Sequence, residues 1–148
     1  MKILMVCLGN ICRSPLAEGI LQSKVHSDSI QVDSAGTAAY HVGELPDQRS
    51  IAVAKKYGID LTKQRARKFS VKDFDTFDLI YAMDASNYQN ILDLARNNED
   101  EQKVKLILNE IDSESNSDVP DPYYGENDGF ENVYQMLDTA CAIIALKN

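Results

Sequence analysis

A cysteine and an arginine, separated by five residues, lie where the first apolar run of the chain ends. The stretch from Val6 to Pro15 reads VCLGNICRSP, and Cys7 and Arg13 stand at the two ends of a short loop that contains a glycine. So short a loop curls around one small anion, and the arginine can hold two of its oxygens in a planar fork. Backbone N–H groups and a helix amino end bind anions and favour an ionised thiol. The residues therefore predict a thiolate at the floor of a phosphate cradle.

Two other interpretations of this loop are weaker. A nucleotide-binding phosphate loop would continue with Gly-Lys-Ser/Thr, which is absent here. A buried core cysteine is common in proteins, and a bare Cys-x5-Arg pattern arises often by chance. The glycine, asparagine, serine and proline in the same turn favour a working anion site, in which Ser14 can donate a hydrogen bond to the sulfur.

A second chemical group is expected in the acidic, proline-bearing segment 109–128, NEIDSESNSDVPDPYYGEND. Cleavage of a phosphate monoester needs a proton for the leaving group, and Asp121 is the candidate donor because Pro122 stiffens the chain beside it. Tyr123 and Tyr124 follow, and adjacent rings in a polar loop favour a slot that selects aryl over alkyl phosphates. Phosphorylation of these tyrosines is an alternative. Other carboxylates of the segment are interpreted as solvated surface: Asp112, Asp118 and Asp128.

Alternating strands and helices are expected to position these groups. Apolar runs predict buried strands, and helical spacing of apolar residues predicts a helix after each. The strands are expected at 2–8, 30–34, 78–83 and 104–108, and the helices from Ser14 onward and at 46–57, 84–96 and 130–146. This order indicates an α/β fold with a parallel sheet and right-handed crossovers.

The topology brings three unusual segments to one edge of the sheet. Ligands of open parallel sheets bind outside the carboxyl ends of the strands. Cys7 follows the first strand, residues 34–37 the second, and segment 109–128 the fourth. A chain of 148 residues, 44% of them hydrophobic, has the size of a single domain, so we expect one domain over 1–148.

Composition indicates which kinds of partner and which cellular compartment are expected. A net charge of −8 and a pI near 4.7 disfavour nucleic acid as a partner, because phosphate backbones are bound by basic surfaces. No apolar stretch reaches the length of a membrane span. The three cysteines are an odd number, and two of them share one motif, which favours a reducing, cytoplasmic location over a disulfide framework.

The stretch from Val6 to Pro15 resembles the active-site signature of the low-molecular-weight protein-tyrosine phosphatases, Cys-x-Gly-Asn-x-Cys-Arg-Ser-Pro, at every fixed position. Segments 34–37 (SAGT), 77–84 (FDLIYAMD) and 121–124 (DPYY) have counterparts in that family in the same order. The resemblance implies one domain with a four-stranded parallel sheet flanked by helices on both faces, in the flavodoxin-like phosphotyrosine phosphatase I topology.

The resemblance also implies roles for residues of this chain. Cys7 is expected to attack phosphorus, Arg13 to bind phosphate and stabilise the transition state, and Asp121 to act as general acid and then as the base that activates water. Further substrate-binding residues are expected to be Leu8, Gly9, Asn10, Ile11, Cys12, Ser14, Tyr40, Tyr123 and Tyr124, with Asn10, Ser14 and Asp84 supporting the loop. The expected partners are a phosphotyrosine-containing protein and phosphate or another tetrahedral oxyanion. No cofactor and no metal are expected, because the loop and Arg13 supply the positive charge.

The chain departs from the family pattern at Gln64, where many members have a histidine, and this change is expected to alter support behind the loop without changing the chemistry. Tyr40 and His41 occupy a loop that varies between members and tunes substrate choice. Whether Cys7 and Cys12 form a regulatory disulfide is left open, because it depends on their geometry.

Two rival functions remain at this point. A thiol-dependent arsenate reductase needs additional cysteines to relay oxidation, and only Cys12 and Cys141 accompany Cys7, with Cys141 on the apolar stripe of the last helix. A non-catalytic phosphate-binding or phosphocysteine carrier module would need the cradle and the thiol but no proton donor. Asp121 and its neighbouring tyrosines count against that carrier function.

Overall fold

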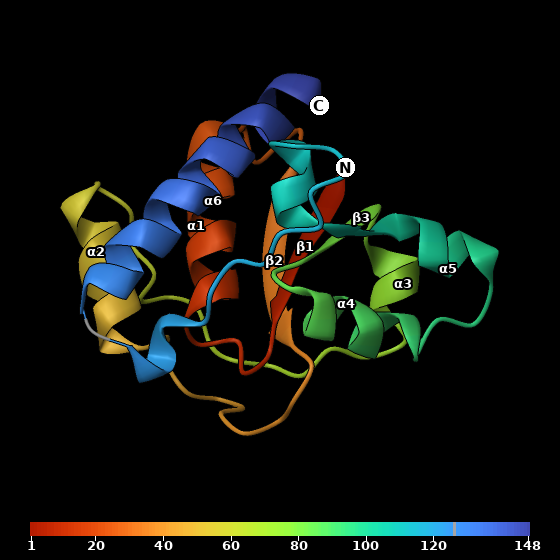
Figure 1. Ribbon diagram of the computed structural model, residues 1–148, viewed down its shortest axis with the longest axis horizontal. Helices are drawn as coiled ribbons and strands as arrows, with labels where there is room; N and C mark the ends of the chain where they lie inside the picture. The colour runs from red at the N-terminus through yellow and green to blue at the C-terminus, as the bar shows by residue number, and fades with distance from the viewer. Residues whose placement is uncertain (126) are drawn as a thin grey trace.

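The computed structural model describes residues 1–125 and 127–148, with the side chains of all of these except Tyr124 and Asn127. Four strands alternate with helices along the chain, as Figure 1 shows. The strands are β1 (Lys2–Cys7), β2 (Gln31–Gly36), β3 (Leu79–Ala82) and β4 (Val104–Leu106). The α-helices are α1 (Arg13–Lys24), α2 (Gln48–Lys56), α3 (Asp73–Thr76), α4 (Ala85–Leu92), α5 (Asn98–Lys103) and α6 (Asn127–Lys147), and the 3-10 helices are η1 (Ile107–Glu110) and η2 (Pro122–Tyr124).

The strands form one parallel sheet in the order β2-β1-β3-β4. β1 lies in the interior of the sheet and is buried from Ile3 to Cys7, because both of its faces are covered. Successive side chains of a strand point to opposite faces. Ile3 and Met5 therefore join one apolar cluster, and Leu4 and Val6 join another.

Helices cover both faces of the sheet (Figure 1). On one face α1 packs against α6 and α2, with Leu16 and Leu137 among the buried residues. On the other face α3 and α4 contribute Phe74 and Ile91 to the second cluster. The predicted four-stranded parallel sheet flanked by helices on both faces is confirmed, whereas the exact domain bounds, 1–148, stay a prediction.

The helices differ from the prediction in number and length. The expected helix 84–96 ends at Leu92, and the separate α5 follows because the side chain of Asn97 accepts a hydrogen bond from Asp100 N (2.9 Å) and caps it. The expected strand 104–108 ends at Leu106 and continues as η1, and the last helix begins at residue 127 rather than 130. α3 and α5 are short and mostly polar, so they lack the apolar periodicity that predicts a helix.

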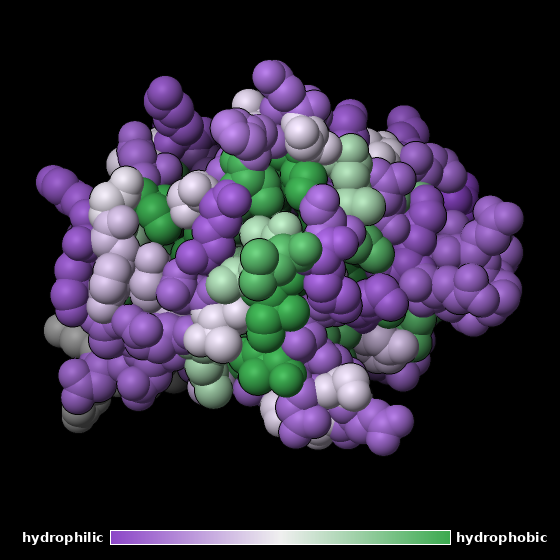
Figure 2. Space-filling view, turned by 90° about the horizontal axis from the view of Figure 1, so that it is seen from above, coloured by the Kyte–Doolittle hydropathy of each residue, from purple (hydrophilic) through white to green (hydrophobic). Residues whose placement is uncertain are grey.

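The two ends of the sheet differ in character. Figure 2 shows the face at the amino ends of the strands, where hydrophilic side chains surround a band of apolar ones. The opposite, carboxyl end carries the loop from Cys7 to Arg13, so these two residues lie on the side of the molecule away from the face in Figure 2. Among the described residues, no helix has both the length and the apolar character needed to cross a membrane.

Candidate active site

The predicted loop forms a cavity at the carboxyl edge of the sheet. Cys7 ends β1 and Arg13 begins α1, and both residues are buried. The cavity has a volume of about 70 Å³. Its lining residues come from the loop, from the segment after β2 and from η2: Cys7, Leu8, Gly9, Ile11, Cys12, Arg13, Tyr40, His41, Asp121 and Tyr123.

The carbonyl groups of the loop are hydrogen bonded away from its centre. The carbonyls of Cys7 and Leu8 accept from Thr37 N and Ala38 N, each at 2.9 Å, and that of Ile11 accepts from Asp47 N at 2.8 Å. C=O and N–H of a planar trans peptide point in opposite directions. The loop therefore turns N–H groups inward, which is the arrangement that binds an anion.

Gly36 lets the loop lie close to the end of β2. A Cβ at this position would stand 2.7 Å from Leu8 O and 3.0 Å from Asn10 N, which real side chains do not tolerate. Asn10 itself has a left-handed φ of 58°, a conformation in which asparagine is among the enriched residues. The shape of the loop thus depends on the second strand as well as on its own sequence.

Asn10 and Ser14 lie beneath the loop, not at its mouth, and both are buried. The Asn10 amide donates to Ser14 Oγ at 2.8 Å and to Ser34 Oγ at 2.9 Å, while its Oδ1 accepts from Arg67 N at 3.0 Å. Ser14 Oγ lies 3.0 Å from Cys7 Sγ. Asn10 and Ser14 therefore lie where they can support the loop, and the Ser14 hydroxyl contacts the Cys7 sulfur.

Arg13 is held by three oxygen atoms around its guanidinium. Its Nη1 donates to Asp84 Oδ2 at 2.6 Å and to the Val119 carbonyl at 3.0 Å, and its Nη2 lies 3.6 Å from Asp121 Oδ2. Burial lowers the pKa of Arg13, but the charge of Cys7 and the hydrogen bond to Asp84 outweigh it, so the pKa is raised. Arg13 is therefore a fixed cation at the side of the cavity.

Asp121 reaches the cavity because its segment is anchored to the end of β3. Val119 N donates to Met83 O at 2.8 Å, and Ala85 N donates to Asp118 Oδ1 at 2.8 Å. Asp121 then caps η2 by accepting from Tyr123 N at 3.0 Å. Its carboxylate remains one-third exposed, so it can exchange protons with solvent.

The aromatic residues are placed differently from one another. Tyr123 and Tyr40 both line the cavity, and Tyr40 is 75% exposed at its rim. The ring of His41 lies 6.3 Å from that of Tyr123 and also lines the cavity. Tyr124 was expected to form part of the wall, but its side chain lies outside the described residues.

Arg49 connects the start of α2 with η2. It forms a forked pair with Asp47, at 3.0 Å for each of two contacts, and donates to Tyr123 O at 3.1 Å. Its guanidinium also stands 4.5 Å from the centre of the Phe130 ring. Asp47 in turn caps α2 and binds the loop at Ile11 O. Arg49 therefore ties the phosphate loop to the segment that carries Asp121, a connection that the sequence does not reveal.

The two remaining cysteines, Cys12 and Cys141, are buried thiols with raised pKa values. All three cysteines are free. Burial, with the charge of Asp47, raises the pKa of Cys12 to about 12. Burial likewise raises the pKa of Cys141 to about 12, and its thiol contacts Ala17 O at 3.8 Å. Neither thiol is readily ionised to attack an oxidised Cys7, and the question of a disulfide between Cys7 and Cys12 stays open.

The structure brings together most of the residues predicted from the sequence. Apart from Asn10 and Ser14, which lie beneath it, the loop residues line the cavity with Asp121, Tyr40 and Tyr123, and Asp84 binds Arg13. Residues that sequence reasoning missed are Ser34, Glu18, Arg49 and the carbonyl of Val119. Ser34 belongs to the quoted segment 34–37, so its place at the strand end was the one signal that could have found it.

A small parallel α/β domain with a cysteine and an arginine at the ends of an anion-binding loop defines a class of phosphate-handling proteins. The family model described as "Low molecular weight phosphotyrosine protein phosphatase" matches residues 2–147. The chain belongs to this family, whose members are protein-tyrosine phosphatases, and it is an enzyme of that type.

Individual relatives agree with this assignment. Low molecular weight phosphotyrosine protein phosphatases of Schizosaccharomyces pombe and Homo sapiens are 44% and 40% identical to this chain over 143 and 145 residues, covering 93% and 95% of the chain and 90% of each relative. A crystal structure of a protein tyrosine phosphatase from Entamoeba histolytica with Hepes in the active site has a TM-score of 0.92 at 38% identity, covering 99% and 96% of the two chains. Vibrio vulnificus Wzb in complex with benzylphosphonate has a TM-score of 0.89 at 32% identity, covering 99% and 98%.

Proposed function

We propose that this protein hydrolyses phosphotyrosine in proteins through a cysteinyl-phosphate intermediate. The observation that carries the proposal is the convergence of the Cys7 sulfur, the Arg13 guanidinium and the Asp121 carboxyl on one small cavity. Phosphoryl transfer needs a nucleophile, positively charged groups that stabilise the negative charge on the equatorial oxygens, and a proton for the leaving oxygen. Each of these needs is matched by one of the three residues.

In the first step the Cys7 sulfur attacks phosphorus and forms an S–P bond while the bond from phosphorus to the phenolic oxygen breaks. Asp121 gives its proton to the departing phenolate. Inward N–H groups of the loop and Arg13 hold the three equatorial oxygens. In the second step Asp121 takes a proton from water, whose oxygen attacks phosphorus, and Cys7 leaves as a thiolate while phosphate is formed.

The proposed substrate class follows from the walls of the cavity. Tyr40, His41 and Tyr123 line it with rings, which suit the flat phenyl group of phosphotyrosine. The benzylphosphonate in the Wzb structure carries such a ring on a tetrahedral phosphorus. A cytoplasmic location fits the three free thiols. Asp121 and these rings favour an enzyme over a phosphate carrier. The raised pKa values of the Cys12 and Cys141 thiols disfavour arsenate reduction.

The activity is tested most directly with p-nitrophenyl phosphate and no added metal. We expect hydrolysis to proceed unchanged in EDTA, because Arg13 and the loop supply the positive charge, and we expect vanadate to inhibit competitively as a trigonal mimic of the transferred group. Release of p-nitrophenolate is followed by its absorbance. Loss of the activity in EDTA, with recovery on adding a divalent cation, would show that the reaction needs a metal ion and would contradict the proposed mechanism.

Arg49→Ala should slow substrates that depend on the proton from Asp121. Without the contacts to Asp47 and Tyr123 O, η2 is held less firmly, and small misplacements of a catalytic group are costly. We expect kcat/KM for phenyl phosphate to fall roughly tenfold and kcat/KM for p-nitrophenyl phosphate, whose leaving group needs a proton less, to fall by less. Lys56→Ala, which removes an exposed cation from the same helix, is the matched control. An equal fall for both substrates would contradict a role in positioning Asp121.

A further inference from the structure

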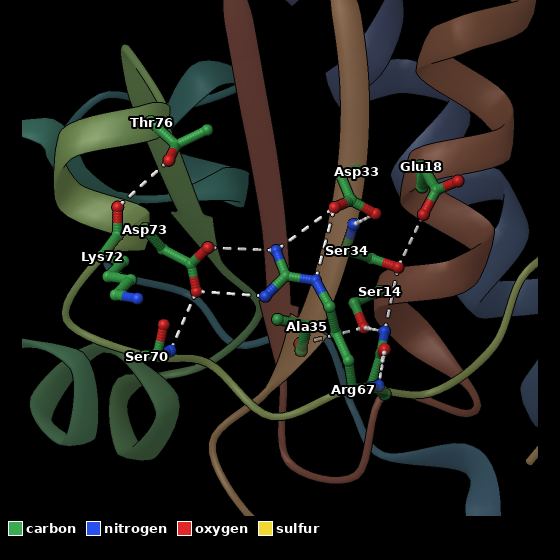
Figure 3. A network of polar contacts seen from close by, with 11 residues as sticks. Ser14, Glu18, Asp33, Ser34, Ala35, Arg67, Ser70, Lys72, Asp73 and Thr76 are labelled. Carbon is green, nitrogen blue, oxygen red and sulfur yellow. Dashed lines mark hydrogen bonds and ion pairs between the residues drawn. The ribbon is translucent and has the colours of Figure 1, made fainter. Parts of the chain in front are cut away.

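A half-buried carboxyl group lies behind the phosphate loop and is not used by the proposed mechanism. Glu18 belongs to α1, one turn after Ser14, and its Oε1 accepts a hydrogen bond from Ser34 Oγ at 2.7 Å. Ser34 Oγ accepts in turn from the Asn10 amide at 2.9 Å. Figure 3 shows the dashed contact between Glu18 and the Ser34 hydroxyl, with Ser14 on the side of Ser34 away from Glu18. The Asn10 amide also donates to Ser14 Oγ, at 2.8 Å. An unbroken line of hydrogen bonds therefore joins Glu18 to the residue that contacts Cys7.

Counting donors fixes the direction of these bonds. The Oδ1 of Asn10 accepts from Arg67 N, so the two hydrogens of its amide nitrogen face Ser14 and Ser34. Each serine oxygen thus accepts from Asn10 and keeps one hydrogen to give elsewhere. Ser34 gives its hydrogen to Glu18. The thiolate proposed for Cys7 can only accept, so the Ser14 hydrogen goes to the sulfur, 3.0 Å away, and not to Ala35 O at 3.5 Å.

Glu18 has little cationic compensation. Arg67 is the cation that faces it, and the Arg67 guanidinium is shared with Asp33 at 3.2 Å and Asp73 at 3.1 Å (Figure 3). Asp33 adds a like charge beside Glu18. Gln64, which donates to Pro15 O at 3.1 Å at the start of the same helix, is neutral. Burial raises the pKa of Glu18, the Ser34 hydrogen bond and Arg67 lower it, and Asp33 raises it, and the balance of these effects is a pKa of about 7. Glu18 therefore changes its charge close to neutral pH.

We propose that Glu18 is a positioning residue whose ionised form, acting through Ser34 and Asn10, holds the Ser14 hydroxyl against Cys7. This proposal rests on the proposed role of Cys7 as nucleophile. A carboxylate can only accept, so it fixes the Ser34 hydrogen and leaves the Ser34 oxygen to Asn10. A protonated carboxyl brings its own O–H, which competes with Asn10 for that oxygen. Asn10 is then held less firmly in its left-handed conformation, and the bond from Ser14 to the sulfur weakens with it.

The test measures the reactivity of the Cys7 thiol in the absence of substrate. Wild type, Glu18→Gln and the control Glu99→Gln, which changes an exposed glutamate of α5, are treated with iodoacetamide between about pH 5 and 9, and labelled Cys7 is quantified by mass spectrometry. In wild type and the control we expect a step of roughly two- to threefold in reactivity near neutral pH, in addition to the ionisation of Cys7 itself. In Glu18→Gln the step should be absent. A step that survives in Glu18→Gln would overturn the proposal.

Ser34→Ala distinguishes the hydrogen-bonded route from a direct effect of charge. This variant keeps the Glu18 carboxyl but removes the hydroxyl that connects it to Asn10, so the step should disappear here too. A step that persists in Ser34→Ala would overturn the route through Ser34. Because labelling needs no substrate, these outcomes remain readable even if another residue proves to be the nucleophile, which the Cys7→Ser variant decides separately.

Urea unfolding provides the second measurement. The folded protein raises the pKa of Glu18 from its usual 4.5 to about 7 by burial, so the folded state binds more protons than the unfolded state between these values. The stabilisation is present below the lower value and is lost as the pH rises to the higher one. The unfolding midpoint of wild type should therefore fall relative to that of Glu18→Gln across this window. Parallel midpoints would show that Glu18 does not titrate there and would overturn the proposal.

Discussion

Cys7→Ser is expected to abolish phosphatase turnover, with kcat for p-nitrophenyl phosphate reduced by at least about 10⁴-fold, because removal of a catalytic nucleophile leaves only binding and charge stabilisation. A serine hydroxyl at the end of β1 retains the size of the thiol, but it ionises far less readily and leaves less well in the second step. The N–H groups of the loop and the Arg13 guanidinium stay in place. The variant should therefore still bind inorganic phosphate, seen as a rise in its melting temperature when phosphate is added.

Cys141→Ala is the matched control for this experiment. It removes a thiol that is fully buried between α6 and α1, away from the cavity, so turnover should stay close to that of wild type. Acid quenching of wild type during turnover should trap phosphate on the peptide that contains Cys7, as expected for a covalent intermediate. Substantial turnover by Cys7→Ser would eliminate the cysteinyl-phosphate mechanism, whereas loss of phosphate binding as well would point to a collapsed loop.

Asp121→Asn has the second largest expected effect, and its size should depend on the leaving group. General acids contribute typically about 10²- to 10⁴-fold, so kcat/KM for phenyl phosphate, which reports only the step that expels the phenolate, should fall by roughly that factor. p-Nitrophenolate departs without much help, and its kcat/KM should fall less. Measurements over a series of substituted aryl phosphates should give a steeper dependence on leaving-group pKa than in wild type. The limb of the pH profile that reports deprotonation of the general acid should disappear.

Asp112→Asn tests whether another carboxylate of the same segment donates the proton. Asp112 is exposed just after η1, whereas Asp121 lies 3.6 Å from Arg13. We expect the control to leave both the rates and the leaving-group dependence unchanged. If Asp121→Asn lowered kcat/KM equally for all aryl phosphates, its carboxyl would act through η2 and Arg13 and not as the proton donor.

The two inner strands, β1 and β3, were predictable because they are nearly continuous apolar runs, which is the composition of a strand buried on both faces. The short helices α3 and α5 were not, because their ends are set by single polar contacts, such as the cap that Asn97 gives to α5. In the same way Cys7 and Arg13 share one motif and were found together. Their placement at the carboxyl edge followed from topology alone.

The support behind the site could not be predicted, since it joins residues that are distant in the chain. Arg13 binds the carbonyl of Val119, which leaves no trace in the side-chain sequence. Glu18 meets Ser34 across α1 and β2, and nothing in the pattern of α1 distinguishes a half-buried glutamate from an exposed one. Arg49 is likewise one of four arginines outside the loop, and its contact with Tyr123 O is what sets it apart. Such contacts depend on how elements pack, which periodicity does not encode.

The missing side chain at Gly36 bears on attempts to transplant this chemistry. Because the backbone of β2 passes within contact distance of Leu8 and Asn10, the ten-residue signature acquires its curvature partly from a neighbour that it does not contain. The main-chain N–H of Arg67, donated from a third part of the chain, completes the mould. A protein engineer who grafted the signature alone onto another scaffold would carry over the reactive groups without the template that gives them their shape.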